Sequence, residues 1–264
     1  MDKWITKNQA LIFRISAIIF IFTGIAIARF TSVGSLTACA IYVMLVVLMF
    51  TLLTVITTKT TQRLMSIFED TCDPTEIYDF FEHLYVKYSK NIVYQINHSF
   101  VLSLSGRKNE QKAFLEGIDI NKQKNSLICF IYYNNLFNAY YSLNEQDKME
   151  QAYENAIKYY NAIKSEKTKK CYEKSINELN LDCAILRGNV EDAISYIEKK
   201  PQNKLLDKVD YSLSMAKILI MQNEAEKAKE YLSFVIQNAN KISLGQETKE
   251  ILVKISWFIY ITVL

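Results

Sequence analysis

The chain has 264 residues and a net charge of +3, and half of its residues are hydrophobic. Residues 1–59 sum to +4, so the rest of the chain sums to −1 and has no net positive field to hold phosphates, which argues against nucleic-acid binding. The five cysteines include no Cys-x-x-Cys pair, which argues against a metal cage and indicates buried thiols in a reducing compartment. A high content of Lys, Asn, Ile and Tyr is typical of an AT-rich bacterial genome.

Two apolar runs near the N-terminus predict membrane-spanning helices over about 10–28 and 36–56. The second run has no charged residue over 21 positions, and a helix of about 20 residues crosses the hydrocarbon core. The first run carries Arg14 one turn from its start, where its head group reaches the interface. A short turn with Gly34 joins the runs, so residues 1–58 form a transmembrane helical hairpin whose residues 10–56 contact lipid.

Basic residues mark the orientation of this hairpin. Lys3 and Lys7 precede it and Lys59 and Arg63 follow it, whereas Arg29 alone lies in the connecting turn. This bias predicts a multi-pass cell-membrane protein whose termini and C-terminal domain are cytoplasmic. A cleaved signal peptide ending at Ala26-Ile27-Ala28 is the alternative for the first run.

The rest of the chain is poor in helix breakers and predicts an all-α domain over residues 74–264, after a linker at 59–73. Asp73, Pro74 and Glu76 form a helix-start signal, in which Asp73 caps the free N–H groups and Pro74 takes the first helical position. The expected helices are 74–90, 92–105, 110–120, 126–143, 147–164, 170–187, 190–200, 205–222, 224–240 and 246–264.

Three segments of this domain match one another, namely Asn135–Tyr160, Asn180–Pro201 and Met215–Ile236. Their shared positions are a turn residue at Asn144, Gly188 and Asn223, a position five residues later at Met149, Ala193 and Ala228, and a large apolar residue at Tyr153, Ile197 and Leu232. Asn is the non-glycine residue best suited to a left-handed turn, so all three turn residues fit one backbone.

These segments resemble the tetratricopeptide repeat family over about residues 92–240. Leu136 and Tyr140 match the family's first helix, although Phe137 stands where the family has glycine, and Pro201 matches its terminal proline. The resemblance implies a TPR-like α-solenoid of antiparallel helix pairs behind the two transmembrane helices, with a concave groove that binds peptides. The repeats are degenerate: Lys200 occupies a position where the family has a small residue. A non-repetitive helical bundle is the alternative.

The resemblance places a candidate binding surface on the first helices of successive pairs. Asn134, Asn138 and Tyr141 share one helix face, and amide groups both donate to and accept from a peptide backbone. The equivalent faces of the next pairs present Glu178, Asp182 and Lys217. We therefore expect these six residues to contact a partner, although a solvated surface would have the same pattern.

No enzyme motif is present, and we expect no catalytic residue, no cofactor and no metal site. His83 is expected at the surface beside a carboxylate, and His98 is expected to be partly buried. The apolar tail 251–264 is too short to span a bilayer, and it packs on the domain, on the membrane or on a partner.

The sequence thus predicts a membrane-anchored protein–protein interaction scaffold or adaptor that binds a protein or peptide partner through a helical-repeat groove. The alternative is a membrane-associated regulatory or immunity protein that acts through the transmembrane hairpin. The sequence leaves open the partner, the pathway and the oligomeric state.

Overall fold

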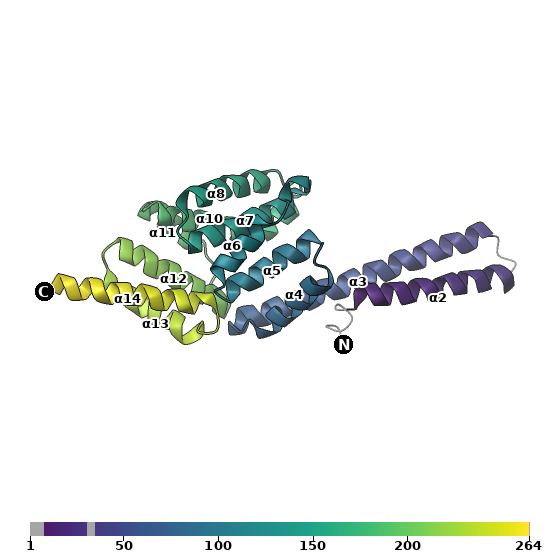
Figure 1. The fold of residues 1–264 in the computed structure, drawn as a ribbon, viewed down its shortest axis with the longest axis horizontal. Helices are drawn as coiled ribbons and strands as arrows, with labels where there is room; N and C mark the ends of the chain where they lie inside the picture. Colours follow the sequence, from purple (N-terminus) through teal and green to yellow (C-terminus); the bar gives the residue numbers. More distant parts are fainter. Residues whose placement is uncertain (1–7, 31–34, 264) are drawn as a thin grey trace. The chain divides into compact units, whose positions relative to one another are not determined.

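The computed structural model describes residues 8–30 and 35–263, and every regular element in those ranges is a helix. The chain divides into two compact units, residues 1–66 and 67–264. The all-α prediction is confirmed for the described residues (Figure 1). The helices are α2 (Gln9–Phe30), α3 (Ser35–Thr71), α4 (Thr75–Lys87), α5 (Ile92–Leu104), α6 (Lys108–Glu116), the 3-10 turn η1 (Ile120–Lys122), α7 (Ser126–Ser142), α8 (Gln146–Asn161), α9 (Glu166–Cys171), α10 (Glu173–Leu186), α11 (Val190–Ile197), α12 (Leu205–Met221), α13 (Ala225–Asn238) and α14 (Ser243–Val263).

The first unit holds one helix, α3, that is long and apolar enough over Ala40–Thr71 to cross a membrane. Several of its threonine hydroxyls donate to carbonyls one turn back, for example Thr51 to Val47 and Thr54 to Phe50, so these polar groups are satisfied within the helix. In α2 the described apolar stretch is shorter, Ile15–Ala26. The structure therefore supports one span, and a second crossing stays a prediction.

Helix α3 has no break after the predicted span. The linker expected at 59–73 is helical through Thr71. Several sequence expectations lie outside the described residues: Lys3 and Lys7, the turn residues 31–34, the side chain of Arg14, and the tail side chains from Ser256 onward.

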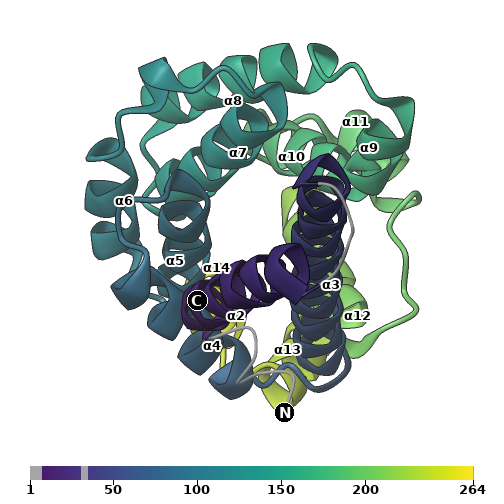
Figure 2. The same ribbon diagram turned by 90° about the vertical axis from the view of Figure 1, so that its right-hand side faces the viewer.

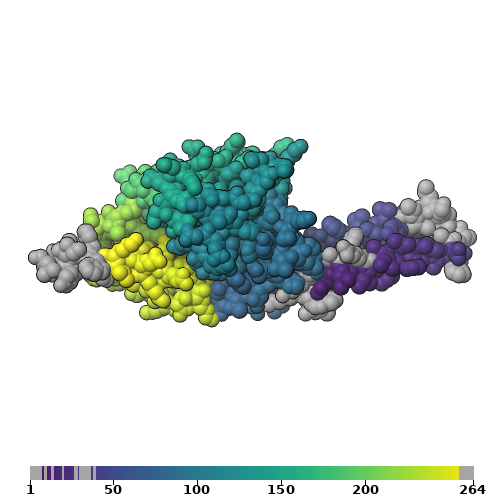
Figure 3. All heavy atoms as spheres, viewed as in Figure 1, coloured from purple at the N-terminus to yellow at the C-terminus, as the bar shows by residue number. Residues whose placement is uncertain are grey.

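In the second unit, helices that are neighbours in sequence pack on one another from α4 to α8 and from α9 to α14, and α8 contacts α10. The unit also closes on itself, because α14 contacts α5. Figure 2 shows the helices from α4 to α14 following one another in a ring, and Figure 3 shows the last helices lying against the α4–α6 segment. Lys241 Nζ joins Asp73 at 2.6 Å, although the two residues are 168 positions apart.

Four turns of this unit share one backbone conformation, with positive φ at Gly106, Asn144, Gly188 and Asn223. In each turn the next residue's N–H bonds to the carbonyl five residues before it, as Glu145 does to Tyr140 over 3.0 Å and Glu224 to Leu219 over 2.8 Å. This is the Schellman arrangement that satisfies free carbonyls at a helix end. The three turn residues predicted from the matching segments are therefore confirmed as left-handed, and Gly106 adds a fourth.

The residues that follow these turns at equal spacing are buried. Met149, Ala193 and Ala228 are at most 2% exposed, and Phe137 is completely buried in the position where the resembled family has glycine. The ring centroid of Phe137 lies 6.0 Å from that of Tyr141, so the larger side chain fills the core between helices.

From α4 onward, the α-helices begin and end within four residues of the expected ones, with one exception. The helix expected at 170–187 is interrupted at Tyr172, which separates α9 from α10. The Tyr172 ring packs edge-to-face on Phe130, 5.8 Å away, and this contact draws Tyr172 toward the core. Helix α4 begins at Thr75 rather than Pro74, but the Asp73 carboxylate accepts the Thr75 N–H at 3.1 Å, as the start signal predicts.

The free cysteines differ in burial. Cys72, Cys129 and Cys183 are buried, as expected, but Cys171 is exposed and lies in the short helix α9, which has no buried residue.

Candidate functional site

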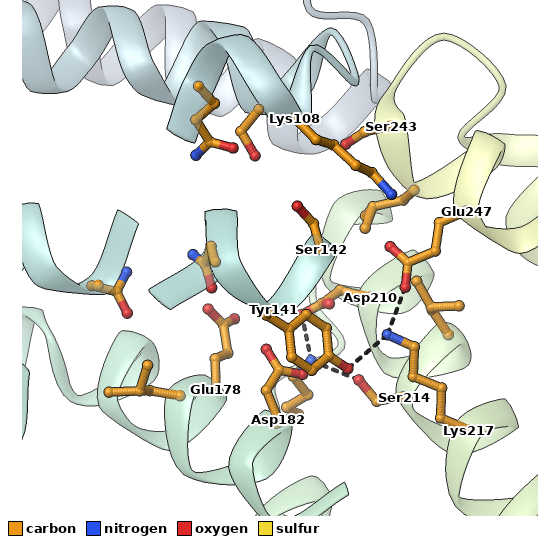
Figure 4. A pocket seen from close by; sticks show the side chains of 18 residues that line it. Lys108, Tyr141, Ser142, Glu178, Asp182, Asp210, Ser214, Lys217, Ser243 and Glu247 are labelled. Carbon is orange, nitrogen blue, oxygen red and sulfur yellow. Dashed lines mark hydrogen bonds and ion pairs between the residues drawn. The ribbon is translucent and has the colours of Figure 1, made fainter. Parts of the chain in front are cut away.

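A cavity of about 210 Å³ lies inside the second unit, and we call it the polar cavity. Five helices, α5, α6, α7, α10 and α12, and the start of α14 contribute to its wall. Figure 4 shows side chains from these elements directed toward one another. Its lining is Ser103, Lys108, Gln111, Asn134, Asn138, Tyr141, Ser142, Glu178, Leu179, Asp182, Lys200, Asp210, Leu213, Ser214, Lys217, Ser243, Leu244 and Glu247.

All six residues singled out from the sequence line this cavity. Helix α7 contributes Asn134, Asn138 and Tyr141, helix α10 contributes Glu178 and Asp182, and helix α12 contributes Lys217. The structure thus brings together residues up to 83 positions apart, but their contact with a partner stays a prediction.

The common turn explains why these residues meet. Asn138, Asp182 and Lys217 each lie six residues before the left-handed residue of their own turn. Because residues four apart share a helix face, Asn134 and Glu178 accompany them one turn earlier. Equivalent positions of consecutive helix pairs therefore face the same space.

Lys217 joins three helices at one side of the cavity. Its Nζ lies 2.7 Å from Glu247 Oε1 on α14 and donates to Tyr141 Oη on α7 at 3.0 Å (Figure 4). Burial alone would lower the pKa of Lys217, but Tyr141, Glu247 and Asp182 together raise it well above its ordinary value. The Glu247 pKa is lowered because Lys217 outweighs the effect of burial, so this pair stays ionised at neutral pH.

A second cation, Lys200, lies beside α12. Its side chain is 4% exposed, pairs with Asp210 and donates to Ser214 Oγ at 3.2 Å. Lys200 stands where the resembled family has a small residue, so its departure from that pattern places a charge in the cavity wall.

The carboxylates of α10 are less well neutralised. Glu178 has one cation within ion-pair range, Lys174 at 3.8 Å, and Lys174 also bonds to Asp207. Burial raises the pKa of Glu178 to about 7, and Asp210 adds to that effect while Lys200 and Lys174 oppose it. For Asp182, burial raises the pKa to about 6 against the opposing effect of Lys217 and Lys200.

Sequence reasoning missed nine polar residues of the wall, among them Lys108, Lys200, Asp210, Ser214 and Glu247. The mismatch of Lys200 with the family pattern was a usable signal, and Asp210 and Ser214 lie on the same α12 that carries Lys217. No local sequence pattern identifies Glu247 or Lys108 as cavity residues. Both lie in the same wall only because α14 packs against the earlier helices of the unit.

The two histidines lie elsewhere. His98 is buried, its Nδ1 lies 2.8 Å from Glu82 Oε2 and its ring stacks on Tyr85 at 4.1 Å. His83 is exposed. The exposure of His83 is as expected, whereas His98 is more deeply buried than the partly buried position expected for it. In the described ranges, no three His, Cys, Asp or Glu side chains are grouped to hold a metal ion.

No protein-family model, curated protein or solved structure matches the chain. The function must therefore be inferred from the chemistry of the polar cavity. Its wall offers amides that have no hydrogen-bond partner among the described residues, and charges partly withdrawn from water, where charge-assisted hydrogen bonds to a ligand are stronger than in bulk water.

Proposed function

We propose that the chain is a membrane-anchored binding protein, a scaffold or adaptor, whose TPR-like helical-repeat domain receives part of a protein or peptide partner in the polar cavity. The observation that carries this proposal is the convergence of equivalent helix positions on one cavity. Asn138, Asp182 and Lys217 occupy the same place relative to three successive turns, and all three line that cavity.

The repeated turns support a solenoid of antiparallel helix pairs. Each turn has the same positive φ and the same carbonyl bond, and each is followed five residues later by a buried position. A repeat array presents successive first helices along one continuous inner surface, which is the usual binding surface of such domains.

The side-chain amides of Asn134 and Asn138, which have no hydrogen-bond partner among the described residues, also support binding. Asn138 is exposed as well. Asn side chains that only maintain a fold normally bond to backbone, as Asn91, Asn125 and Asn189 do at helix starts.

For the membrane part, we propose two crossings with both termini in the cytoplasm. The length and composition of α3 support one crossing, and the basic residues outside the two runs support the orientation. Labelling of single cysteines in intact cells tests the orientation. A cysteine introduced at residue 150 that reacts with an impermeant reagent before lysis would refute it.

Site-specific photo-crosslinking of the full chain in its native membrane tests the binding function. A photoreactive residue at position 138 is expected to form a discrete adduct with a partner. The same residue at position 154, exposed on α8 and not part of the cavity wall, is the matched control. Equal adducts at both positions, or none at position 138, would refute a partner in the polar cavity.

A further inference from the structure

We propose that the polar cavity recognises a cationic group, an ammonium or a guanidinium, that bridges the carboxylates of Glu178 and Asp182. This inference rests on the proposed function, because it names the chemistry of the group that the cavity receives. Both side chains project into the cavity from the same face of α10 (Figure 4).

The charges of the wall are not balanced among themselves. Its acidic and basic side chains include two ion pairs, Lys200 with Asp210 and Lys217 with Glu247. Three groups remain: Glu178, Asp182 and Lys108. Outside these two pairs the wall therefore carries two acidic side chains and one basic side chain, which favours a cation as the occupant.

Asp182 has no hydrogen bond and no ion pair with any residue in the described part of the chain. Glu178 reaches Lys174 only at 3.8 Å, and Lys174 is shared with the more deeply buried Asp207. Both carboxylates are partly withdrawn from water, with the Glu178 side chain 33% exposed, and their ionisation there costs free energy unless something neutralises them. A bound cation supplies the missing partner to both groups.

The spacing suits a shared cation. Glu178 and Asp182 are four residues apart on α10, so their Cβ atoms lie about 5–6 Å from one another on one face. An ammonium has three donors and a guanidinium has five, enough to bond both carboxylates. Asn134 and Asn138 have the same spacing on α7 and offer further carbonyl acceptors across the cavity.

An anionic or apolar occupant fits less well. An anion bound to Lys108 would share the cavity with two carboxylates that lack full counter-charges. An apolar group would leave buried charges without partners. The volume of about 210 Å³ holds one side chain or one small amine rather than a folded segment.

The two carboxylates give the site a pH dependence. They face Lys174, Lys200, Lys217, Asp210 and Glu247, and the net result is a pKa of about 7 for Glu178 and about 6 for Asp182. A cation favours their ionised forms, so its binding releases protons below about pH 7 and strengthens as pH rises from 6 to 8.

Equilibrium dialysis of the full chain in detergent tests the inference with two cation sources. The first is agmatine, a free amine with a guanidinium. The second is the blocked tripeptide acetyl-Gly-Arg-Gly-amide, and acetyl-Gly-norleucine-Gly-amide is its neutral counterpart. The test variant is Glu178→Gln with Asp182→Asn. The matched control is Glu154→Gln with Glu191→Gln, which removes two exposed carboxylates.

We expect at least one cationic probe to bind about tenfold more tightly than the neutral tripeptide, and the test variant to lose that preference. Binding of agmatine alone identifies a small amine, and binding of the arginine tripeptide identifies a peptide side chain. Equal binding of the cationic and neutral probes overturns the inference, as does undiminished cation binding by the test variant or absence of binding by all probes. The crosslink at position 138 is independent: an adduct that survives the test variant would leave the proposed function standing and refute the cationic group.

Discussion

Lys217 of α12 lies 2.7 Å from Glu247 of α14, and this ion pair ties the repeated helices to the last helix of the domain. The same Nζ bonds to Tyr141 on α7, so one cation holds three helices that are far apart in sequence. Both charged side chains are largely buried, at 16% and 25% exposure, so water compensates poorly for the loss of either one.

We therefore expect Lys217→Met to lower the free energy of unfolding by about 3 kcal/mol, since it leaves Glu247 charged and unpaired beside the cavity. Urea unfolding of the full chain in detergent measures this change. Adding Glu247→Leu to the variant should restore much of the loss. Lys122→Met removes an exposed pair with Asp119 and should leave the unfolding midpoint unchanged. A midpoint equally unchanged in Lys217→Met would show that the pair does not hold α14.

The second prediction concerns pH. The folded-state pKa of Asp182 is about 6, above its ordinary value of 3.8, so the folded state binds a proton more tightly than the unfolded state. This group therefore favours folding most below about pH 4, and its contribution is lost as pH rises through 6. Asp182→Asn should raise the free energy of unfolding at pH 8 by about 1–3 kcal/mol and change it little at pH 4.

Denaturant unfolding of wild type and Asp182→Asn at several pH values tests this sign. Glu154→Gln, which alters an exposed carboxylate on α8, is the control and should follow the wild-type pH profile. A variant that is less stable than wild type at pH 8 would mean that Lys217 and Lys200 already neutralise Asp182 fully, and it would remove the shortage of counter-charge on which the cationic-ligand inference depends.

The third prediction concerns the shared turn. Gly188 has φ of +69° and no atom within 4 Å of an added Cβ, so Gly188→Ala meets backbone strain alone. We expect a loss of about 1 kcal/mol. Gly117 has an ordinary negative φ of −78°, and Gly117→Ala should be neutral or slightly stabilising. Thermal unfolding of the two variants compares them, and equal melting temperatures would contradict the left-handed turn.

The contrast between Asn144 and Tyr172 shows what the sequence could predict. The left-handed turn at Asn144 depends on neighbours within a few residues, so a repeated local pattern was enough to place it. The break between α9 and α10 depends on the Tyr172 ring packing on Phe130, a contact 42 positions away in sequence, and no local signal marks it.

The residues of the polar cavity likewise differ in whether a local sequence pattern could predict them. Asn134, Asn138, Glu178 and Asp182 follow from one helix face repeated at each turn, so the sequence pattern found them. Glu247 and Lys108 line the same cavity because α14 packs against helices that come much earlier in the chain, and such long-range packing leaves no local sequence pattern.

The fourth prediction concerns the packing of Phe137. Phe137 is completely buried between Tyr141 and Tyr153, and its truncation to alanine leaves a cavity in the core. Phe137→Ala should lower the free energy of unfolding by about 3–5 kcal/mol. Val86→Ala, at a position 71% exposed, is the control and should change stability by less than about 0.5 kcal/mol. A loss below about 1 kcal/mol in Phe137→Ala would indicate that the site collapses around the smaller residue.

The last prediction separates binding from stability at the amides of α7. Asn134 and Asn138 line the polar cavity without a hydrogen bond to another described residue, so their truncation removes nothing that holds the fold. The double change Asn134→Ala with Asn138→Ala should leave the melting temperature close to that of wild type. If each amide makes one hydrogen bond to a partner, the double change costs about 1–3 kcal/mol of affinity, or roughly tenfold or more. Titration of the crosslinked partner against both proteins measures this ratio. Asn155→Ala, on α8 and outside the cavity wall, is the matched control and should bind as wild type does. Unchanged affinity in the double variant would move the partner's contacts away from α7.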